Sequence, residues 1–175
     1  SATGGGSGFE NLVLSSRNGT LSADILAVVS NHATGGVFER AKKLGVTFVH
    51  FPSPWNTENY QWIVKKFRPD FTALSGWLKL VSGLDPKTTF NIHPGPLPQF
   101  GGQGMYGHHV HEAVLANYKR YKLACESAVS MHFVTEEYDQ GPVFFHLPVV
   151  IWEDDTADTL GQRVNAMEHM FQSFI

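Results

Sequence analysis

Three polar side chains, an amide, an imidazole and a carboxylate, stand where they could act on an acyl group. Asn91 and His93 lie in Asn91-Ile92-His93-Pro94-Gly95-Pro96-Leu97-Pro98, and Asp139 follows in Tyr138-Asp139-Gln140-Gly141-Pro142. An amide and an imidazole can stabilise a developing oxyanion, and an imidazole beside a carboxylate can transfer protons. Together they predict a site where an acyl group is attacked and its oxyanion is held.

The segments around these residues favour a rigid site at the end of a strand. Asn91 and His93 alternate, so they point to the same side of a strand, which Pro94 ends. The carboxyl ends of parallel strands face the crevice where open α/β sheets bind ligands. Gly and Pro shape the turn that carries Asp139, and this carboxylate, if it lies beside His93, is expected to raise the pKa of His93 and favour a protonated general acid.

Apolar runs and helical patterns alternate along the chain. The runs at Ile25–Val29, Val46–Val49, Phe71–Leu74 and Thr89–Ile92 read as buried parallel strands, and Ser127–Val134 and Val143–Ile151 as two further extended segments. Helices are predicted after the opening glycines and over Val37–Leu44, Thr57–Phe67, His109–Asn117 and Ala157 to the end of the chain, with no C-cap there.

This order predicts an α/β fold: an open, mostly parallel, twisted Rossmann-like sheet with helices on both faces and antiparallel strands in the C-terminal part. The length of 175 residues suits one domain, residues 1–175. The glycines Gly4–Gly8 open a helix but follow no strand, so we expect that the native domain has a first strand before them and a further end after Ile175.

Several polar groups have two interpretations. Gly4–Gly8 is either a glycine-rich tail or a loop that offers free N–H groups to a phosphate. His108, His109 and His111 share a helical segment, yet no fourth ligand has matching spacing, so we expect them to rim a ligand pocket rather than hold a metal. His132 is interpreted as a partly buried core or supporting residue.

Composition excludes several classes of partner. The net charge of -3 and the lack of a long basic cluster make nucleic acid an unexpected partner. No apolar run reaches the roughly 18 to 20 residues that span a bilayer, so no membrane partner is expected. Cys125 is the only cysteine, which favours a reducing cytoplasm. No oligomeric state is predicted.

The chain resembles the phosphoribosylglycinamide formyltransferase family, the folate-dependent enzymes of purine synthesis, along nearly its whole length. The Asn-x-His and Asp-x-Gly-Pro motifs mark the wider formyltetrahydrofolate-dependent superfamily. The shared segments run in the family's order: Gly4–Ser7, Val29–Asn31, Phe38–Ala41, Ser75–Lys79, Asn91–Pro94, Gly107–His111, His132–Glu137, Asp139–Pro142 and Arg163–His169.

This resemblance implies transfer of a formyl group from 10-formyltetrahydrofolate, the co-substrate, to the amine of glycinamide ribonucleotide, with no metal. Asn91, His93 and Asp139 would be catalytic. Glycinamide ribonucleotide would contact Gly6, Ser7, Gly8 and Glu168, the last at its glycinamide end. The folate would contact Leu78, Lys79, Leu80, Val81, Glu136, Glu137, Tyr138, Gln140 and Gly141.

Some positions depart from the family pattern. Gly8 stands where an Asn usually follows Gly-Ser, the stretch Gln99–Tyr106 is longer than the common connection, and an arginine often found in the folate site has no clear equivalent. The alternatives are a formyltetrahydrofolate hydrolase, in which water replaces the amine, another formyltetrahydrofolate-dependent formyltransferase, and a non-enzymatic binding module with the same fold.

Overall fold

The computed structural model describes residues 5–121 and 126–173. The opening residues up to Gly4, the sole cysteine Cys125, and Ile175 lie outside these ranges. Strands and helices alternate, as predicted. Their order is α1 (Ser7–Asn18), β1 (Ala27–Ser30), α2 (Gly36–Leu44), β2 (Thr47–His50), α3 (Thr57–Phe67), β3 (Thr72–Leu74), β4 (Thr89–His93), α4 (His108–Tyr121), β5 (Glu126–Phe133), β6 (Val143–Val150) and α5 (Ala157–Phe171).

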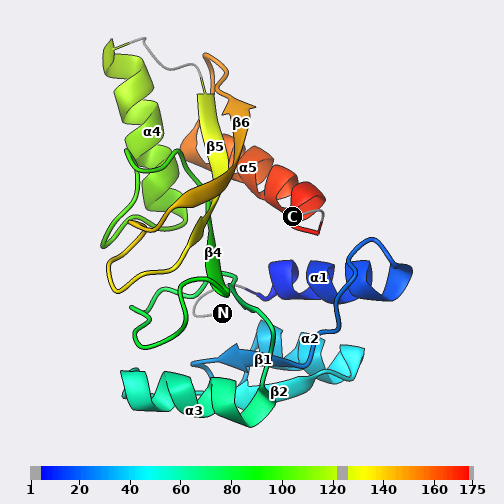
Figure 1. The fold of residues 1–175 in the computed structure, drawn as a ribbon. Coiled ribbons are helices and arrows are strands. Elements are labelled where there is room, and N and C mark those ends of the chain that lie inside the picture. The colour runs from blue at the N-terminus through cyan, green and yellow to red at the C-terminus, as the bar shows by residue number, and fades with distance from the viewer. Residues whose placement is uncertain (1–4, 122–125, 174–175) are drawn as a thin grey trace.

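The strands form two groups, which lie one above the other in Figure 1. β1 and β2 pair in parallel, and β3 and β4 pair in parallel. β4 then pairs antiparallel with β5, and β5 antiparallel with β6. The α/β class and the antiparallel strands near the C-terminal part are therefore confirmed. Among the described residues, no strand pairs with both sheets to join them. The expected strand before the glycine loop stays a prediction.

Helices cover both faces of the β1–β2 pair because neighbouring residues of a strand point to opposite sides. Val28 packs in a cluster with Phe9 of α1 and Val37 of α2. Val29, the next residue, packs with a second cluster that contains Tyr60 of α3 and Leu74 of β3. This second cluster therefore joins the β1–β2 unit to the strands that carry the site.

The larger core lies against one side of the β4–β6 strands. Val110 and Val114 of α4 pack against Val129 of β5 and Leu160 of α5. α4 and α5 also contact each other, so they form one layer beside the strands (Figure 1). α4 begins after the Gln99–Tyr106 stretch and α5 carries Glu168, and residues of both helices line one cavity.

Several element boundaries differ from the sequence predictions. The runs Ile25–Val29 and Phe71–Leu74 were expected to be buried strands, but Leu26 is 49% and Phe71 66% exposed, and both residues lie outside the strands. α4 is longer than predicted. The prediction that the last helix continues to the end of the chain is wrong, since α5 ends at Phe171. No helix in the described ranges is both long and apolar enough to cross a membrane.

Asp155 joins the end of β6 to the start of α5. Its carboxylate accepts hydrogen bonds from the Trp152 N–H at 2.8 Å and from the Thr159 hydroxyl at 2.8 Å, and it forms an ion pair with Arg163. Arg163 also donates to the Val150 carbonyl at 2.9 Å. Burial raises the pKa of Asp155, but the hydrogen bonds it accepts outweigh burial and hold the pKa below its ordinary value.

We expect Asp155→Asn to lower the free energy of unfolding by about 2 to 3 kcal/mol at pH 7, as for hydrogen bonds to a charged group. The interactions that depress the folded-state pKa of Asp155 stabilise the protein at pH values above the unfolded pKa. This stabilisation is lost as pH falls through the folded pKa. The difference from wild type should therefore shrink below about pH 4. Urea unfolding at several pH values measures it, with exposed Asp154→Asn as control. A difference that does not change with pH would contradict the ion pair.

Candidate functional site

Asn91 and His93 lie at the carboxyl end of β4, and the alternation of the strand turns both to one side. β4 lies between β3 and β5, and the paired residues include Leu74 with Asn91 and Asn91 with His132. His93 is only 2% exposed. Gly95 lies so close that a Cβ there would come within 2.4 Å of Val110 and 3.4 Å of the His93 ring, so the turn after Pro94 packs directly on the imidazole.

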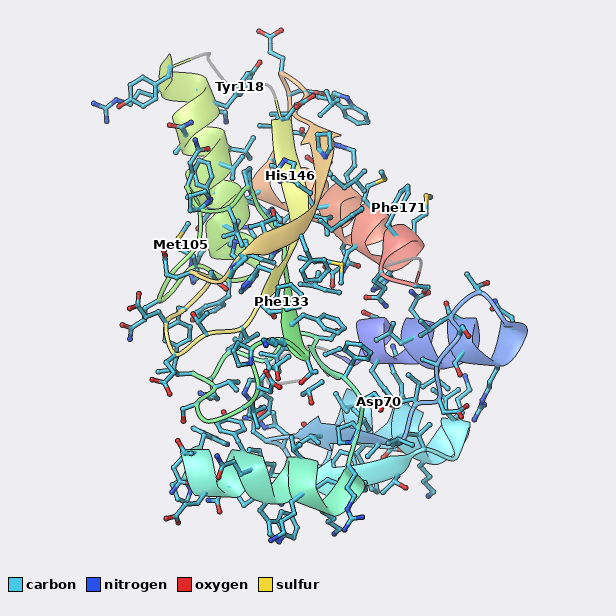
Figure 2. All side chains as sticks on the ribbon, in the orientation of Figure 1. Asp70, Met105, Tyr118, Phe133, His146 and Phe171 are labelled. Carbon is cyan, nitrogen blue, oxygen red and sulfur yellow. The ribbon has the colours of Figure 1, made fainter. Side chains whose placement is uncertain are left out.

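Asp139 reaches the site from the connection between β5 and β6. Its backbone has a φ of 55°, the left-handed region that non-glycine residues seldom adopt. Two residues later, a Cβ on Gly141 would lie 1.7 Å from the Phe133 carbonyl oxygen, so only glycine fits. Figure 2 shows Phe133 at the end of β5 that lies next to β4. This tight turn holds the carboxylate against β4.

The structure brings the three predicted catalytic side chains together. The Asp139 carboxylate lies 3.7 Å from Nδ1 of His93, and Nδ2 of Asn91 donates to Asp139 Oδ1 at 3.4 Å. The His93–Asp139 separation is longer than a hydrogen bond but within the reach of a direct electrostatic interaction. Asn91, His93 and Asp139 also line one cavity of about 600 Å³.

His132 is a fourth member of this cluster, and sequence reasoning assigned it only a supporting position. Its Nδ1–H donates to the Phe133 carbonyl at 2.9 Å. Its Nε2 lies 3.1 Å from Nδ2 of Asn91 and 3.3 Å from Asp139 Oδ1. The antiparallel pairing of β5 with β4 sets His132 opposite Asn91. A single sequence does not reveal this pairing, so it could not place His132 in the site.

The loop between β4 and α4 holds the cluster through backbone groups. Nε2–H of His93 donates to the Phe100 carbonyl at 2.7 Å, and the Gly102 N–H donates to Asp139 Oδ2 at 3.0 Å. Gly101, between them, has no room for a side chain, because a Cβ would meet Leu97 at 2.5 Å and Asp139 at 2.9 Å. The long Gln99–Tyr106 stretch is thus part of the site.

The electrostatics correct one expectation. Burial lowers the pKa of His93, and although the Asp139 charge and the Phe100 hydrogen bond raise it, burial dominates, so the pKa lies below its ordinary value. Asp139 therefore raises the pKa of His93, as predicted, but by less than burial lowers it, so the expected protonated ring is not favoured near neutral pH. The neutral ring keeps its proton on Nε2, which Phe100 holds, and leaves the lone pair of Nδ1 on the side of Asp139.

The carboxylate itself stays ionised. Burial raises the pKa of Asp139, but the hydrogen bond with His132, the His93 ring and the Gly102 N–H together lower it below its ordinary value. A charged Asp139 next to a neutral His93 is an arrangement in which the imidazole can accept a proton and the resulting cation is stabilised at once.

The residues predicted to bind glycinamide ribonucleotide, the formyl acceptor, line the same cavity. Gly6, with a φ of 83°, is the residue directly before α1, and it lines the cavity together with Ser7, Gly8 and Glu168. Gly8 packs closely, since a Cβ there would meet the Ser75 hydroxyl at 2.5 Å. Burial raises the pKa of Glu168 to about 7, so its carboxyl group is partly protonated near neutral pH.

The residues predicted to bind folate are spread more widely. Leu78 and Tyr138 line the main cavity, whereas Val81 and Glu136 line a second cavity of about 280 Å³. The remaining five line neither: Lys79, Leu80, Glu137, Gln140 and Gly141. The Lys79 ammonium lies 4.6 Å from the centre of the Trp55 ring, and the Leu80 carbonyl accepts a hydrogen bond from Tyr60. Gly141 lies in the tight turn that positions Asp139.

The three histidines at the start of α4 have different environments in the structure. His108 and His109 are exposed and lie 3.4 Å from Glu112, and His108 also lies 3.2 Å from Asp158. His111 is 6% exposed and lines the main cavity. The described residues contain no group of three or more His, Cys, Asp or Glu side chains placed to hold a metal ion.

We expect Asp139→Asn to lower the pKa of His93 further below its ordinary value, because the Asp139 charge is what raises it. An NMR titration of the His93 ring protons measures the shift. Glu112→Gln removes an exposed carboxylate on α4 and serves as control. An unchanged or higher His93 pKa in Asp139→Asn would show that the two groups do not interact.

Comparison with known proteins gives a consistent result. Residues 1–174 match the family described as "Formyl transferase". The chain is 35% identical over 180 residues to the chloroplastic phosphoribosylglycinamide formyltransferase of Vigna unguiculata, covering 95% of this chain and 55% of that protein. It is 28% identical over 177 residues to the Escherichia coli phosphoribosylglycinamide formyltransferase, covering 95% of this chain and 79% of that protein.

Solved structures share the fold. The glycinamide ribonucleotide transformylase 1 of Symbiobacterium toebii superposes with a TM-score of 0.84 at 26% identity, over 98% of this chain and 81% of that one. The formyltetrahydrofolate deformylase of Pseudomonas syringae superposes with a TM-score of 0.78 at 19% identity, which shows a common fold alone. The chain spans 55 to 59% of the length of the plant relatives it matches. With the family match over nearly its whole length, the chain belongs to the formyl transferase family.

Proposed function

We propose that the protein transfers a formyl group from 10-formyltetrahydrofolate to the amine of glycinamide ribonucleotide, a step of purine synthesis. One observation carries the proposal: Asn91, His93 and Asp139 meet in a single cavity of about 600 Å³ that also contains the start of α1. The names of the curated relatives and of the similar solved structures support the same substrates. We further propose that residues 1–175 form one domain that acts in the cytoplasm.

The chemistry follows from the cluster. The amine nitrogen of the acceptor attacks the formyl carbon, and the formyl oxygen gains negative charge. Asn91, fixed at the end of β4, would supply an amide N–H for this oxygen by giving up its 3.4 Å hydrogen bond to Asp139. The new nitrogen must lose a proton, and the lone pair of Nδ1 on the neutral His93 is placed to accept it, with Asp139 at 3.7 Å stabilising the cation that forms.

The same proton completes the reaction. When the bond between the formyl carbon and the folate nitrogen breaks, that nitrogen needs a proton, and the protonated His93 can deliver it. The bond formed is the acceptor amide, the bond broken is the folate formamide, and the proton passes from one nitrogen to the other through Nδ1. The Phe100 carbonyl keeps Nε2–H occupied throughout, so the ring exchanges protons only at Nδ1.

The ligands would occupy different walls of the cavity. Gly6, Ser7 and Gly8 at the start of α1 would bind the phosphate, because a helix N-terminus offers unpaired N–H groups and a favourable dipole. Glu168 on α5 would approach the glycinamide end. Leu78 to Val81 and the loop from Glu136 to Gly141 would hold the folate, with Val81 and Glu136 reaching it from the second cavity.

We expect His93→Ala to lower turnover by about 10² to 10⁴-fold, the usual contribution of a general acid–base group. Because catalysis needs neutral His93, kcat/KM should fall as pH drops through the His93 pKa, which lies below its ordinary value of 6.5. The test measures formyl transfer to glycinamide ribonucleotide against pH, with exposed His50→Ala as control. A near-normal rate for His93→Ala would remove His93 from this role, and formate release without acceptor would favour the hydrolase.

Inorganic phosphate should compete with glycinamide ribonucleotide but not with the folate, because the phosphate site at the start of α1 is separate from the folate walls. Initial rates with each substrate varied in turn measure the competition, with sodium chloride at equal ionic strength as control. Ser7→Ala should weaken phosphate inhibition. Competition against the folate alone would contradict this assignment of the two walls.

A further inference from the structure

His111 is a buried polar side chain in the cavity that the proposed chemistry does not use. It lies in the first turn of α4, is 6% exposed and lines the same cavity as His93 and Glu168. Its Nδ1 is buried and has no hydrogen-bond partner among the described residues. A buried N–H without an acceptor is costly, so the unpartnered Nδ1 decides which ring nitrogen of His111 carries the proton.

The packing around His111 is tight. A Cβ on Gly161 of α5 would lie 2.9 Å from Cδ2 and 3.2 Å from Nε2 of the His111 ring, so α5 approaches α4 closely only because residue 161 is glycine. Gly161 itself lines the cavity. The ring is therefore held in one place by the contact of two helices, as expected for a group that fixes a ligand.

The ring is neutral near pH 7. Burial, followed by the neighbouring His108 and His93, lowers the pKa of His111 to about 4. A neutral imidazole carries one N–H and one lone pair. A proton on the buried Nδ1 would have no acceptor. A buried N–H without an acceptor is less tolerated than a buried lone pair without a donor. The proton is therefore assigned to Nε2.

We propose that the Nε2–H of His111 donates a hydrogen bond to an uncharged oxygen of the formyl acceptor, a carbonyl or a hydroxyl. This inference rests on the proposed function. A phosphate group would favour a cation, which this position resists, and the expected phosphate loop lies on α1. The wall beside His111 is formed by Gly161 and Glu168 of α5, whereas none of the predicted folate residues comes from α4 or α5.

Four variants test the donor. His111→Leu keeps much of the side-chain volume without an N–H, and we expect KM for glycinamide ribonucleotide to rise roughly threefold to tenfold, the effect of one lost hydrogen bond, with KM for the folate unchanged. His111→Gln restores an N–H and should recover part of the loss. His109→Leu removes an exposed imidazole that does not line the cavity and should change neither KM. Gly161→Ala keeps His111 but displaces its ring, so it should reproduce the His111→Leu effect.

A spectroscopic measurement separates recognition from mere packing. With ¹⁵N-labelled histidine at pH 7, His111 should show a protonated Nε2 and an unprotonated Nδ1, and glycinamide ribonucleotide, but not the folate, should shift the Nε2 signal. Equal increases in both KM values, or a proton on Nδ1, would overturn the inference. If wild-type protein transfers no formyl group, the proposed function fails, and the acceptor titration of Nε2 still decides whether His111 is the donor.

Discussion

The Asp139 carboxylate is a charge in a largely buried place, and the surrounding structure is arranged around its two oxygens. One oxygen is shared by His132 and Asn91, and the other accepts the Gly102 N–H and faces His93. Removing a carboxylate from water is unfavourable, and these groups together reverse the effect of burial on its pKa. Their donors come from β4, β5 and the loop before α4, so satisfying one charge ties three segments together.

His93 shows the opposite balance. Burial lowers its pKa more than the neighbouring carboxylate raises it, so the pair is an ion next to a neutral ring rather than two opposite charges. Such a pair has a chemical advantage, because the neutral ring can gain a proton during a reaction and the charge that stabilises the product is already present. The helices α4 and α5 contribute by excluding water from this side of the cavity, with Val110 and Leu160 fully buried behind it.

The order of elements and the convergence of Asn91, His93 and Asp139 could be predicted from the sequence, because both depend on local patterns. Strand runs bounded by glycine and proline indicated β4 and the turn at Gly141, and the alternation of Asn91 and His93 indicated one shared face. His132 could not be placed, because its role depends on the pairing of β5 with β4. The protonation of His93 could not be predicted for a related reason: the neighbouring charge can be inferred from motifs, but the degree of burial depends on packing by other segments, such as α4 with Val110.

The loop between β4 and α4 holds His93 and Asp139 by hydrogen bonds with main-chain atoms, the Phe100 carbonyl and the Gly102 N–H. Main-chain contacts depend on the path of the chain and not on the side chains it carries. Gly101 and the glycines with positive φ constrain that path, but exposed positions such as Gln103 and Tyr106 do not. This division makes the loop a favourable region for engineering: the rim of the cavity can be diversified at the exposed positions while the main-chain hydrogen bonds to His93 and Asp139 beneath it are retained.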